Sequence, residues 1–320
     1  MGFSKTIIEK ALDEKRKKRQ QNDSRREALK TKLYTDIPRV AEIDAELSTL
    51  GMKIVTACFS EGAVKVEELR ERCEELYRER ASLFDASLYS VPFDCEKCED
   101  TGIVEGQYCE CITRAAKQYQ YEALSSVMPF GECSFENFLL DYYPEEGNTG
   151  ISPKFRMQKN LNYCKKFVAN FPSGENLLFI GGVGLGKTHL SVAIARELIE
   201  KGYGVYYASI EGLVTNLQKE KFGKLEGDFS IHQAVEDADL LIVDDLGTEF
   251  NTQYSRTAVY EIVNSRILSG KSTIINTNLF MEELNERYTP RVASRFIGNY
   301  TQLLFEGNDI RQQKAMTNRG

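Results

Sequence analysis

The stretch NLLFIGGVGLGKTHLSVAIARELI, residues 176–199, decides the fold of this chain of 320 residues. An apolar run leads into a glycine-rich segment, and an amphipathic pattern with a helical period follows. Gly181, Gly186, Lys187 and Thr188 have the spacing G-x4-G-K-[ST], in which backbone N–H groups surround a phosphate. The stretch therefore predicts a strand, a phosphate-binding loop and a helix whose N-terminus faces a nucleotide.

In such a loop the lysine bridges the β- and γ-phosphates and the threonine hydroxyl ligates Mg²⁺. We therefore expect ATP and Mg²⁺ as cofactors. The residues predicted to bind them are Gly181, Gly182, Gly184, Gly186, Lys187, Thr188 and His189. A purely structural role is also compatible with the position of His189 on the following helix.

Four further apolar runs predict strands that accompany the one at residues 176–182. They lie at residues 204–210, 238–245, 272–278 and 301–307, and helical stretches separate them. Near-continuous apolar strands that alternate with helices are typical of a parallel sheet covered on both faces. The C-terminal half is therefore predicted to be an α/β domain with a five-stranded parallel sheet.

Polar residues at the ends of two of these strands predict the catalytic groups. Asp244 and Asp245 end the run at 238–245, where the first could hold Mg²⁺ through water and the second could polarise an attacking water. Asn278 ends the next run, and its amide could reach between the γ-phosphate and that water. Asn276 lies deeper on the same strand face and is predicted to be structural.

Four cysteines upstream have the spacing C-x2-C-x10-C-x-C. They are Cys95, Cys98, Cys109 and Cys111. Two short knuckles of soft ligands suit tetrahedral zinc, and four thiolates leave no open position, so the predicted site is structural. Free thiols on a polar loop are the alternative. The other cysteines are interpreted as ordinary core or surface residues.

The composition is that of a soluble globular protein, with 42% hydrophobic and 28% charged residues and a net charge of −7. No run approaches the length of a membrane helix, and the N-terminus lacks the features of an export signal, so we expect a cytoplasmic protein. Because the net charge is negative, nucleic-acid binding would need a local basic patch. The run KRKKR at residues 15–19 is more typical of a solvated helix face.

The domain organisation is predicted from shifts in composition. We expect a helical region at residues 1–90, with two helices joined between Gly51 and Gly62, and a zinc-binding module at 91–134. A linker rich in Pro, Gly, Asn and Glu follows at 135–153, and the nucleotide-binding domain occupies 154–320. The helical region is interpreted as a hairpin packed on itself, which is compatible with a docking surface for a partner helix.

Taken together, these motifs resemble the AAA+ ATPases of the DnaC/DnaI bacterial helicase-loader family, which are related to the IstB transposition helpers. The resemblance covers about residues 135–311 through FENF, GGVGLGKTHL, LLIVDD, TIINTN, RVASRF and DIRQ. The cysteine segment resembles the zinc-binding N-terminal module of the DnaI-type loaders. That module contacts the replicative helicase in the family.

The resemblance implies a role for each motif residue. It implies Lys187 and Thr188 as Walker A, Asp244 and Asp245 as Walker B, Asn278 as sensor 1, Arg295 as an arginine finger acting on a neighbouring subunit, and Arg311 as sensor 2. Asp245 stands where many AAA+ proteins have glutamate, and its shorter reach predicts slow hydrolysis. The chain ends soon after Arg311, so we expect no helical lid domain.

The implied partners are a hexameric replicative DNA helicase, single-stranded DNA and further copies of the chain assembled with ATP. For DNA contact the sequence offers residues 218–224, where Lys219, Lys221 and Lys224 surround Phe222. The sequence favours a charged loop with one packed phenylalanine over this DNA contact. An IstB-like helper of a transposase is the second functional hypothesis, and a P-loop kinase of a small metabolite is a third.

Overall fold

A computed structural model describes residues 3, 5–60, 63–125, 133–146, 150–223 and 230–317. The chain divides into two compact units. One comprises Leu12–Ile112, and the other comprises Met1–Ala11 together with Thr113–Gly320. Each unit has its own hydrophobic core. None of the described helices combines the length and the apolar character that a membrane crossing needs.

The larger unit is built on a five-stranded sheet. Its strands are β3 (Asn176–Gly181), β4 (Val205–Ser209), β5 (Leu240–Leu246), β6 (Ser272–Thr277) and β7 (Tyr300–Phe305). They lie in the order β4-β5-β6-β3-β7, and every neighbouring pair is parallel. This confirms the predicted α/β fold and all five predicted strands. Because the strands are parallel, the residues that follow β3, β5 and β6 gather at one edge of the sheet.

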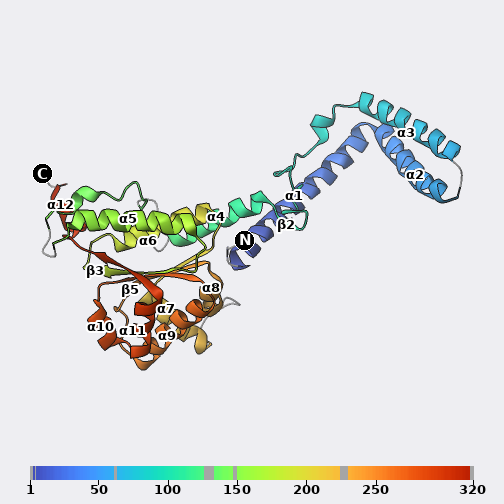
Figure 1. Cartoon of the computed structure of the whole chain (residues 1–320). Coiled ribbons are helices and arrows are strands. Elements are labelled where there is room, and N and C mark those ends of the chain that lie inside the picture. The colour runs from blue at the N-terminus through green and yellow to red at the C-terminus, as the bar shows by residue number, and fades with distance from the viewer. Residues whose placement is uncertain are drawn as a thin grey trace. The chain divides into compact units, whose positions relative to one another are not determined.

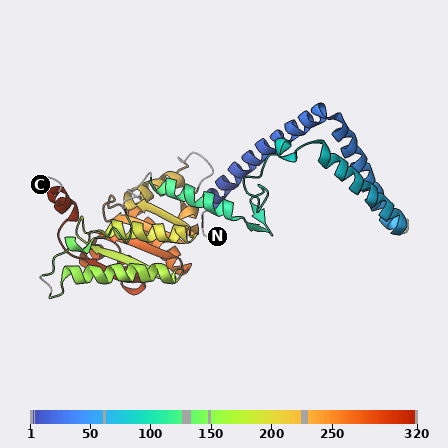
Figure 2. The ribbon, with the colours of Figure 1, turned by 90° about the horizontal axis from the view of Figure 1, so that it is seen from above.

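Helices cover both faces of this sheet (Figure 1). One face carries α5 (Pro153–Asn170) and α6 (Lys187–Glu200), which lie side by side in Figure 2. The other face carries α7 (Ile210–Lys221), α8 (Ile231–Asp237), α9 (Gln253–Leu268), α10 (Met281–Arg287) and α11 (Pro290–Asn299). The short η3 (Leu140–Tyr142) precedes α5, and α12 (Ile310–Thr317) follows β7.

The second face is packed through apolar side chains that alternate along the strands. Leu241 and Val243 of β5 belong to one buried cluster with Val259 of α9 and Phe296 of α11. Burial of each such side chain contributes on the order of 2 kcal/mol. The sheet and the helices α9 and α11 therefore form one continuous core beneath the predicted site.

A fully buried arginine joins α8 to the start of β6. The Arg266 guanidinium donates to the carbonyl oxygens of Val235 at 2.6 Å, Ala238 at 3.1 Å and Ser272 at 2.5 Å. The first two carbonyls lie at the C-terminal end of α8, where a helix lacks internal partners. Burial lowers the pKa of Arg266 to about 10, so the side chain stays charged at neutral pH.

The smaller unit contains helices and a short hairpin. α1 (Lys5–Asp36), α2 (Pro38–Ser60) and α3 (Ala63–Leu83) are followed by η1 (Ala86–Tyr89), by the antiparallel strands β1 (Ile103–Val104) and β2 (Gln107–Tyr108), and by the start of α4 (Glu110–Ser125). Ile43 and Leu50 of α2 pack with Leu76 of α3, as the helical spacing predicted.

The join predicted between Gly51 and Gly62 lies at the end of that interval, because α2 continues through Gly51 to Ser60 and α3 begins at Ala63. One glycine in a helix costs roughly 1 kcal/mol relative to alanine, and the buried contacts of Ile43 and Leu50 with α3 outweigh it. The other glycine of the predicted join, Gly62, lies outside the described residues.

Candidate functional site

A cavity of about 510 Å³ lies in the larger unit where the loops after β3, β5 and β6 meet. Of the residues predicted from the sequence, it is lined by Gly184, Gly186, Lys187, Thr188, His189, Asp244, Asp245, Asn278 and Arg311. Gly181 and Gly182 do not line the cavity, but their carbonyl oxygens accept hydrogen bonds from Lys187, which does. The structure therefore brings almost the whole predicted nucleotide site together, and Arg295 alone lies elsewhere.

The phosphate-binding loop holds its lysine inward. Lys187 Nζ donates to the carbonyl oxygens of Gly181 and Gly182 and to Oδ1 of Asn278, each at 2.7 Å. Burial lowers the pKa of Lys187 to about 8, although Asp244 and Asp245 oppose the shift. The ammonium is thus placed beside the Asn278 amide, and it is still mainly protonated at neutral pH.

The loop also needs glycine for steric reasons. Gly186 has φ of 87°, and a Cβ there would lie 2.8 Å from Cε2 of Phe138. Gly184 has φ of 72°, and a Cβ there would lie 2.0 Å from Oδ1 of Asp309. The backbone can therefore turn its N–H groups toward a phosphate only because these positions carry no side chain.

The Asp244 carboxylate is held by several donors. Thr188 Oγ1 donates to Oδ2 at 3.0 Å, Tyr207 OH donates to Oδ2 at 2.6 Å, and Asn276 Nδ2 donates to Oδ1 at 2.9 Å. A threonine hydroxyl beside a fixed carboxylate is the oxygen pair that Mg²⁺ uses in phosphate-binding loops. Asn276 is fully buried and also donates to Ser191 Oγ at 2.9 Å, in keeping with the structural role expected for it.

The sequence did not identify Tyr207 as a residue of the site. It lies on β4, next to β5, and burial together with Asp244 raises the pKa of its hydroxyl. The only sequence signal was the pair of adjacent tyrosines, Tyr206 and Tyr207, in the middle of a short strand.

Asp245 differs from Asp244 in exposure and in backbone conformation. It has φ of 56°, in the left-handed region, and its side chain is exposed at the rim of the cavity. A non-glycine residue in this region is uncommon and carries strain that the surrounding structure must support. Desolvation and the neighbouring Asp244 raise the pKa of Asp245, which suits a carboxylate that accepts a proton from water.

Aromatic residues before α5 form the apolar side of the cavity. Tyr143 OH donates to the carbonyl oxygen of Leu185 at 2.9 Å, and the Phe138 ring lies 5.5 Å from that of His189. His189 Nε2 lies 2.8 Å from the carbonyl oxygen of Ser134. This apolar wall suits a purine base. The composition of residues 135–153 predicted a linker, and the FENF motif entered only through the family resemblance.

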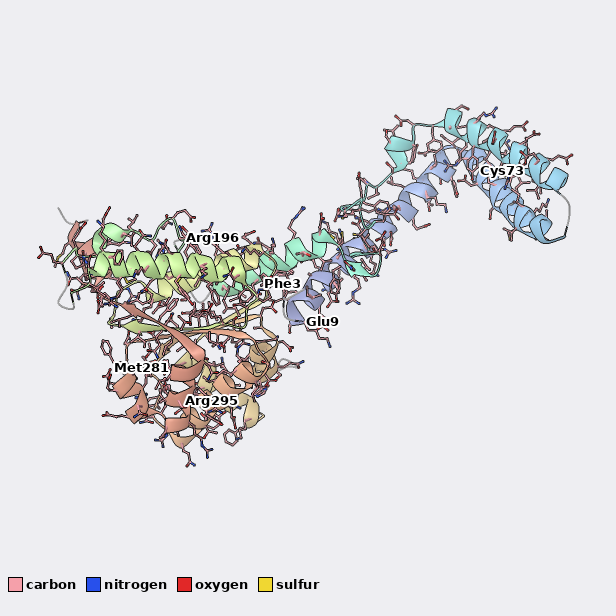
Figure 3. All side chains as sticks on the ribbon, in the orientation of Figure 1. Phe3, Glu9, Cys73, Arg196, Met281 and Arg295 are labelled. Atoms are coloured by element: carbon pink, nitrogen blue, oxygen red, sulfur yellow. The ribbon has the colours of Figure 1, made fainter. Side chains whose placement is uncertain are left out.

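The two predicted arginines lie in different places. Arg311 lines the cavity from α12, whose first residue Ile310 donates its N–H to the Gly184 carbonyl oxygen at 3.0 Å. Arg295 lies on α11, in the helical layer across the sheet from α5 (Figure 3). Its guanidinium donates to Oδ1 of Asn264 at 2.9 and 2.5 Å and to Tyr260 OH at 3.1 Å.

The four predicted cysteines lie together in the smaller unit. Their sulfur atoms are all within 4.8 Å of one another, with Sγ–Sγ distances of 3.7 Å for Cys95–Cys109 and for Cys98–Cys111. A tetrahedron with Zn–S bonds of about 2.3 Å has S–S edges of roughly 3.8 Å. Hydrogen bonding by the Cys98 backbone lowers the pKa of Cys95 to about 7, whereas burial raises the pKa of Cys109 and of Cys111, so the spacing of the sulfur atoms carries the argument for a metal. The cluster therefore fits a zinc ion.

A buried carboxylate supports this cysteine cluster. Asp100 accepts the backbone N–H groups of Asp94 at 3.2 Å and of Cys95 at 3.0 Å, and Lys15 Nζ lies 2.7 Å from its Oδ1. Lys18 pairs with Asp94 at 2.7 Å. Two lysines of the basic run at 15–19 thus have acidic partners beside the cysteines instead of facing solvent alone.

The predicted DNA-contacting residues lie at the end of α7. Phe222 is 62% exposed, so the alternative of a packed phenylalanine is wrong. Lys221 Nζ lies 5.5 Å from the centroid of the Tyr254 ring. Lys224 lies outside the described residues. An exposed aromatic ring beside lysine is the combination that stacks on single-stranded bases.

The larger unit of this chain is similar to several known proteins. Residues 154–297 match the family of IstB-like ATP binding proteins. The replicative helicase loader DnaC of Escherichia coli strain K12 is 26% identical over 217 residues, which cover 67% of this chain and 84% of that protein. A crystal structure of the DnaC helicase loader is 27% identical, with a TM-score of 0.45, and covers 54% of this chain and 98% of that one. A crystal structure of DnaI is 19% identical, with a TM-score of 0.44, and covers 56% and 88%.

Proposed function

The nucleotide-binding region of this chain is related to the DnaC-type helicase loaders, and from this premise we propose that the protein is an ATP-dependent loader of a hexameric replicative DNA helicase. The observation that carries the proposal is the convergence of the phosphate loop, the acidic pair and Asn278 on one cavity. In this proposal ATP binding and slow hydrolysis control how the loader assembles on, and leaves, the helicase.

The residues divide the chemistry of hydrolysis among them. The loop amides and Lys187 would bind the β- and γ-phosphates, and Thr188 with Asp244 would hold Mg²⁺, which neutralises charge on the phosphates. Asp245 would accept a proton from the attacking water, and Asn278 would orient that water. The short reach of an aspartate in this position supports a slow reaction that serves as a timer.

Hydrolysis is proposed to occur between subunits. Arg311 lies in the cavity of its own subunit, whereas Arg295 is held by Asn264 and does not line that cavity. An arginine supplied by a neighbouring subunit can stabilise the charge of the transferring phosphoryl group. This arrangement supports an ATP-dependent homo-oligomer in which Arg295 serves the next subunit.

The residues before about 134 are proposed to bind the helicase. A metal-folded cysteine module gives a short polar segment a rigid surface, since zinc binding can replace a hydrophobic core. Elsewhere in the same unit, α2 exposes the apolar side chains of Met52 and Val55, and α3 exposes that of Tyr77. Exposed apolar side chains of this kind support a protein-binding role. Single-stranded DNA would be bound by the larger unit near Phe222.

The proposal is tested by native mass spectrometry of the full chain with ATP, Mg²⁺ and the replicative helicase of its host. We expect a complex of defined stoichiometry that carries zinc. A Cys95→Ser/Cys98→Ser variant should lose both the zinc and the complex, whereas Cys73→Ser, outside the cluster, should retain both. Failure of the unaltered protein to bind the helicase would overturn the proposal.

The match of residues 154–297 to the IstB-like family favours one second candidate, an ATPase helper that delivers a transposase to DNA. The zinc-suited cysteine cluster favours the loader instead, because it supplies a separate adaptor. In the same experiment, binding of ATP and DNA without a helicase complex, together with a complex formed with a transposase encoded nearby, would favour the helper.

A further inference from the structure

The loop that follows β5 ends in a buried carboxylate that the proposed chemistry does not use. Glu249 is 3% exposed. Its Oε2 accepts the N–H of Gly247 at 3.0 Å, and its Oε1 accepts the hydroxyl of Tyr288 at 2.6 Å and lies 3.5 Å from Nε of Arg287. A buried carboxylate is costly unless it is paired and hydrogen-bonded, so the two oxygens fix Glu249 from two directions.

On the side of its contact with Gly247, Glu249 is connected to the nucleotide cavity. Glu249 directly follows Thr248, which lines the cavity and donates its N–H to the Asp245 carbonyl oxygen at 3.1 Å. Gly247 has φ of 105°, and a Cβ there would lie 2.5 Å from Cδ1 of Leu279, the residue after Asn278. The loop that carries Glu249 therefore contacts the backbone of Asp245 and the residue next to Asn278. Asp245 and Asn278 are the two polar residues that would face the γ-phosphate.

On the side of its contact with Tyr288, Glu249 is connected to α11, the helix that carries Arg295. Tyr288 follows the last residue of α10 and lies two residues before the start of α11. Arg287 Nη2 also donates to the Glu249 carbonyl oxygen, so both the side chain and the backbone of Glu249 hold this junction. Val292 and Phe296 of α11 are fully buried, so the helix shifts as a unit with its packed neighbours.

We infer that Glu249 is a positioning residue that couples nucleotide binding in one subunit to the placement of Arg295, the arginine that the same subunit offers to its neighbour. A shift of the Asp245 loop moves Glu249, and Glu249 moves the α10–α11 junction through Tyr288. The inference rests on the proposed function. It adds the chain of contacts through which nucleotide binding at one site would change the position of the arginine offered to the next site. Asn264 and Tyr260 of α9 keep Arg295 fixed to the moving layer.

Hydrogen exchange of the full chain, with and without Mg²⁺ and a non-hydrolysable ATP analogue, tests this inference. Two variants break the link. Tyr288→Phe removes the donor to Oε1, and Glu249→Met removes both acceptor oxygens in a side chain of similar length. Tyr203→Phe is the matched control, because it removes a tyrosine hydroxyl that donates to the Phe171 carbonyl oxygen at 3.3 Å, remote from the loop.

In the unaltered protein and in Tyr203→Phe, we expect the analogue to slow exchange in peptides covering 181–190 and also to change exchange in peptides covering 288–299. In Tyr288→Phe and in Glu249→Met, the first effect should persist and the second should be lost. If both variants retain the change at 288–299, or if the unaltered protein shows protection at 181–190 alone, the inference is overturned. Absence of protection at 181–190 in the unaltered protein would overturn the nucleotide-binding proposal itself and the inference with it.

Discussion

Lys15 Nζ lies 2.7 Å from Oδ1 of Asp100, and the same carboxylate accepts the backbone N–H of Cys95. A residue of α1 thus reaches a proposed zinc ligand through one carboxylate. Outer partners of this kind orient the ligands of metal sites. The relationship explains why a segment with little apolar surface can present four sulfur atoms at tetrahedral spacing.

Replacing Lys15 with methionine should weaken zinc retention. The substitution leaves the Asp100 carboxylate buried without its cation, and loss of an outer partner typically costs about 10- to 100-fold in metal affinity. The measurement is the rate of zinc transfer to a chromogenic chelator. Lys17→Met, an exposed position on the same helix, serves as the control. Equal transfer rates for the two variants would contradict the role assigned to Lys15.

Replacing Tyr207 with phenylalanine should raise the Mg²⁺ concentration needed for ATP hydrolysis. The hydroxyl that orients Asp244 Oδ2 is lost, while Thr188 and Asn276 still donate to the carboxylate. A hydrogen bond to a charged group contributes roughly 1.5–3 kcal/mol, so we expect a shift of about 10- to 150-fold. Titration of activity with Mg²⁺ at saturating ATP measures it. A lower maximal rate with an unchanged Mg²⁺ midpoint would count against the role of Tyr207 in metal binding.

Nucleotide affinity should fall as the pH rises above about 8. The free protein has a Lys187 pKa of about 8, below the usual 10.5, and phosphate binding requires the charged form. Above that pKa each pH unit therefore costs up to about tenfold in affinity. Binding of a fluorescent ATP analogue between pH 7 and 9.5 measures the effect. Lys187→Arg should bind more weakly but with a flat profile above pH 8, because the guanidinium remains charged. An equally steep profile in that variant would assign the titration to another group.

Replacing Gly51 with alanine should stabilise the smaller unit. Gly51 lies inside α2, and a Cβ there would meet no atom within 4 Å. Alanine is favoured over glycine in a helix by roughly 1 kcal/mol. Urea denaturation followed by circular dichroism measures the gain. The contrasting variant is Gly184→Ala, whose Cβ would overlap Asp309 and which should lose nucleotide binding. A destabilised Gly51→Ala protein would mean that α2 is bent or packed differently at this position.

The parts of the site that could be predicted from the sequence are those determined by residues close together along the chain. Five apolar runs and the spacing from Gly181 to Thr188 predict a parallel sheet and its phosphate loop, because strand burial and loop geometry are local properties. Parallel strands then bring Asp244 and Asn278 to the same edge.

The remaining parts depend on which strands become neighbours. Tyr207 reaches Asp244 only because β4 pairs with β5, and Arg266 finds its carbonyl acceptors only because α8 ends beside β6. Neither contact has a sequence spacing that identifies it. The contribution of the aromatic residues around Phe138 to the cavity was not predicted for a different reason. The turn-forming residues that follow them are typical of a linker.

The contact between Arg295 and Asn264 has a consequence for assembly. A free arginine side chain carries roughly 2 kcal/mol of rotamer entropy, which is lost when the guanidinium is immobilised against a ligand. Here Asn264 and Tyr260 order the side chain within its own subunit before any neighbour arrives. The entropy loss therefore occurs during folding, and in the proposed oligomer an arriving subunit would meet a cation that is already immobile.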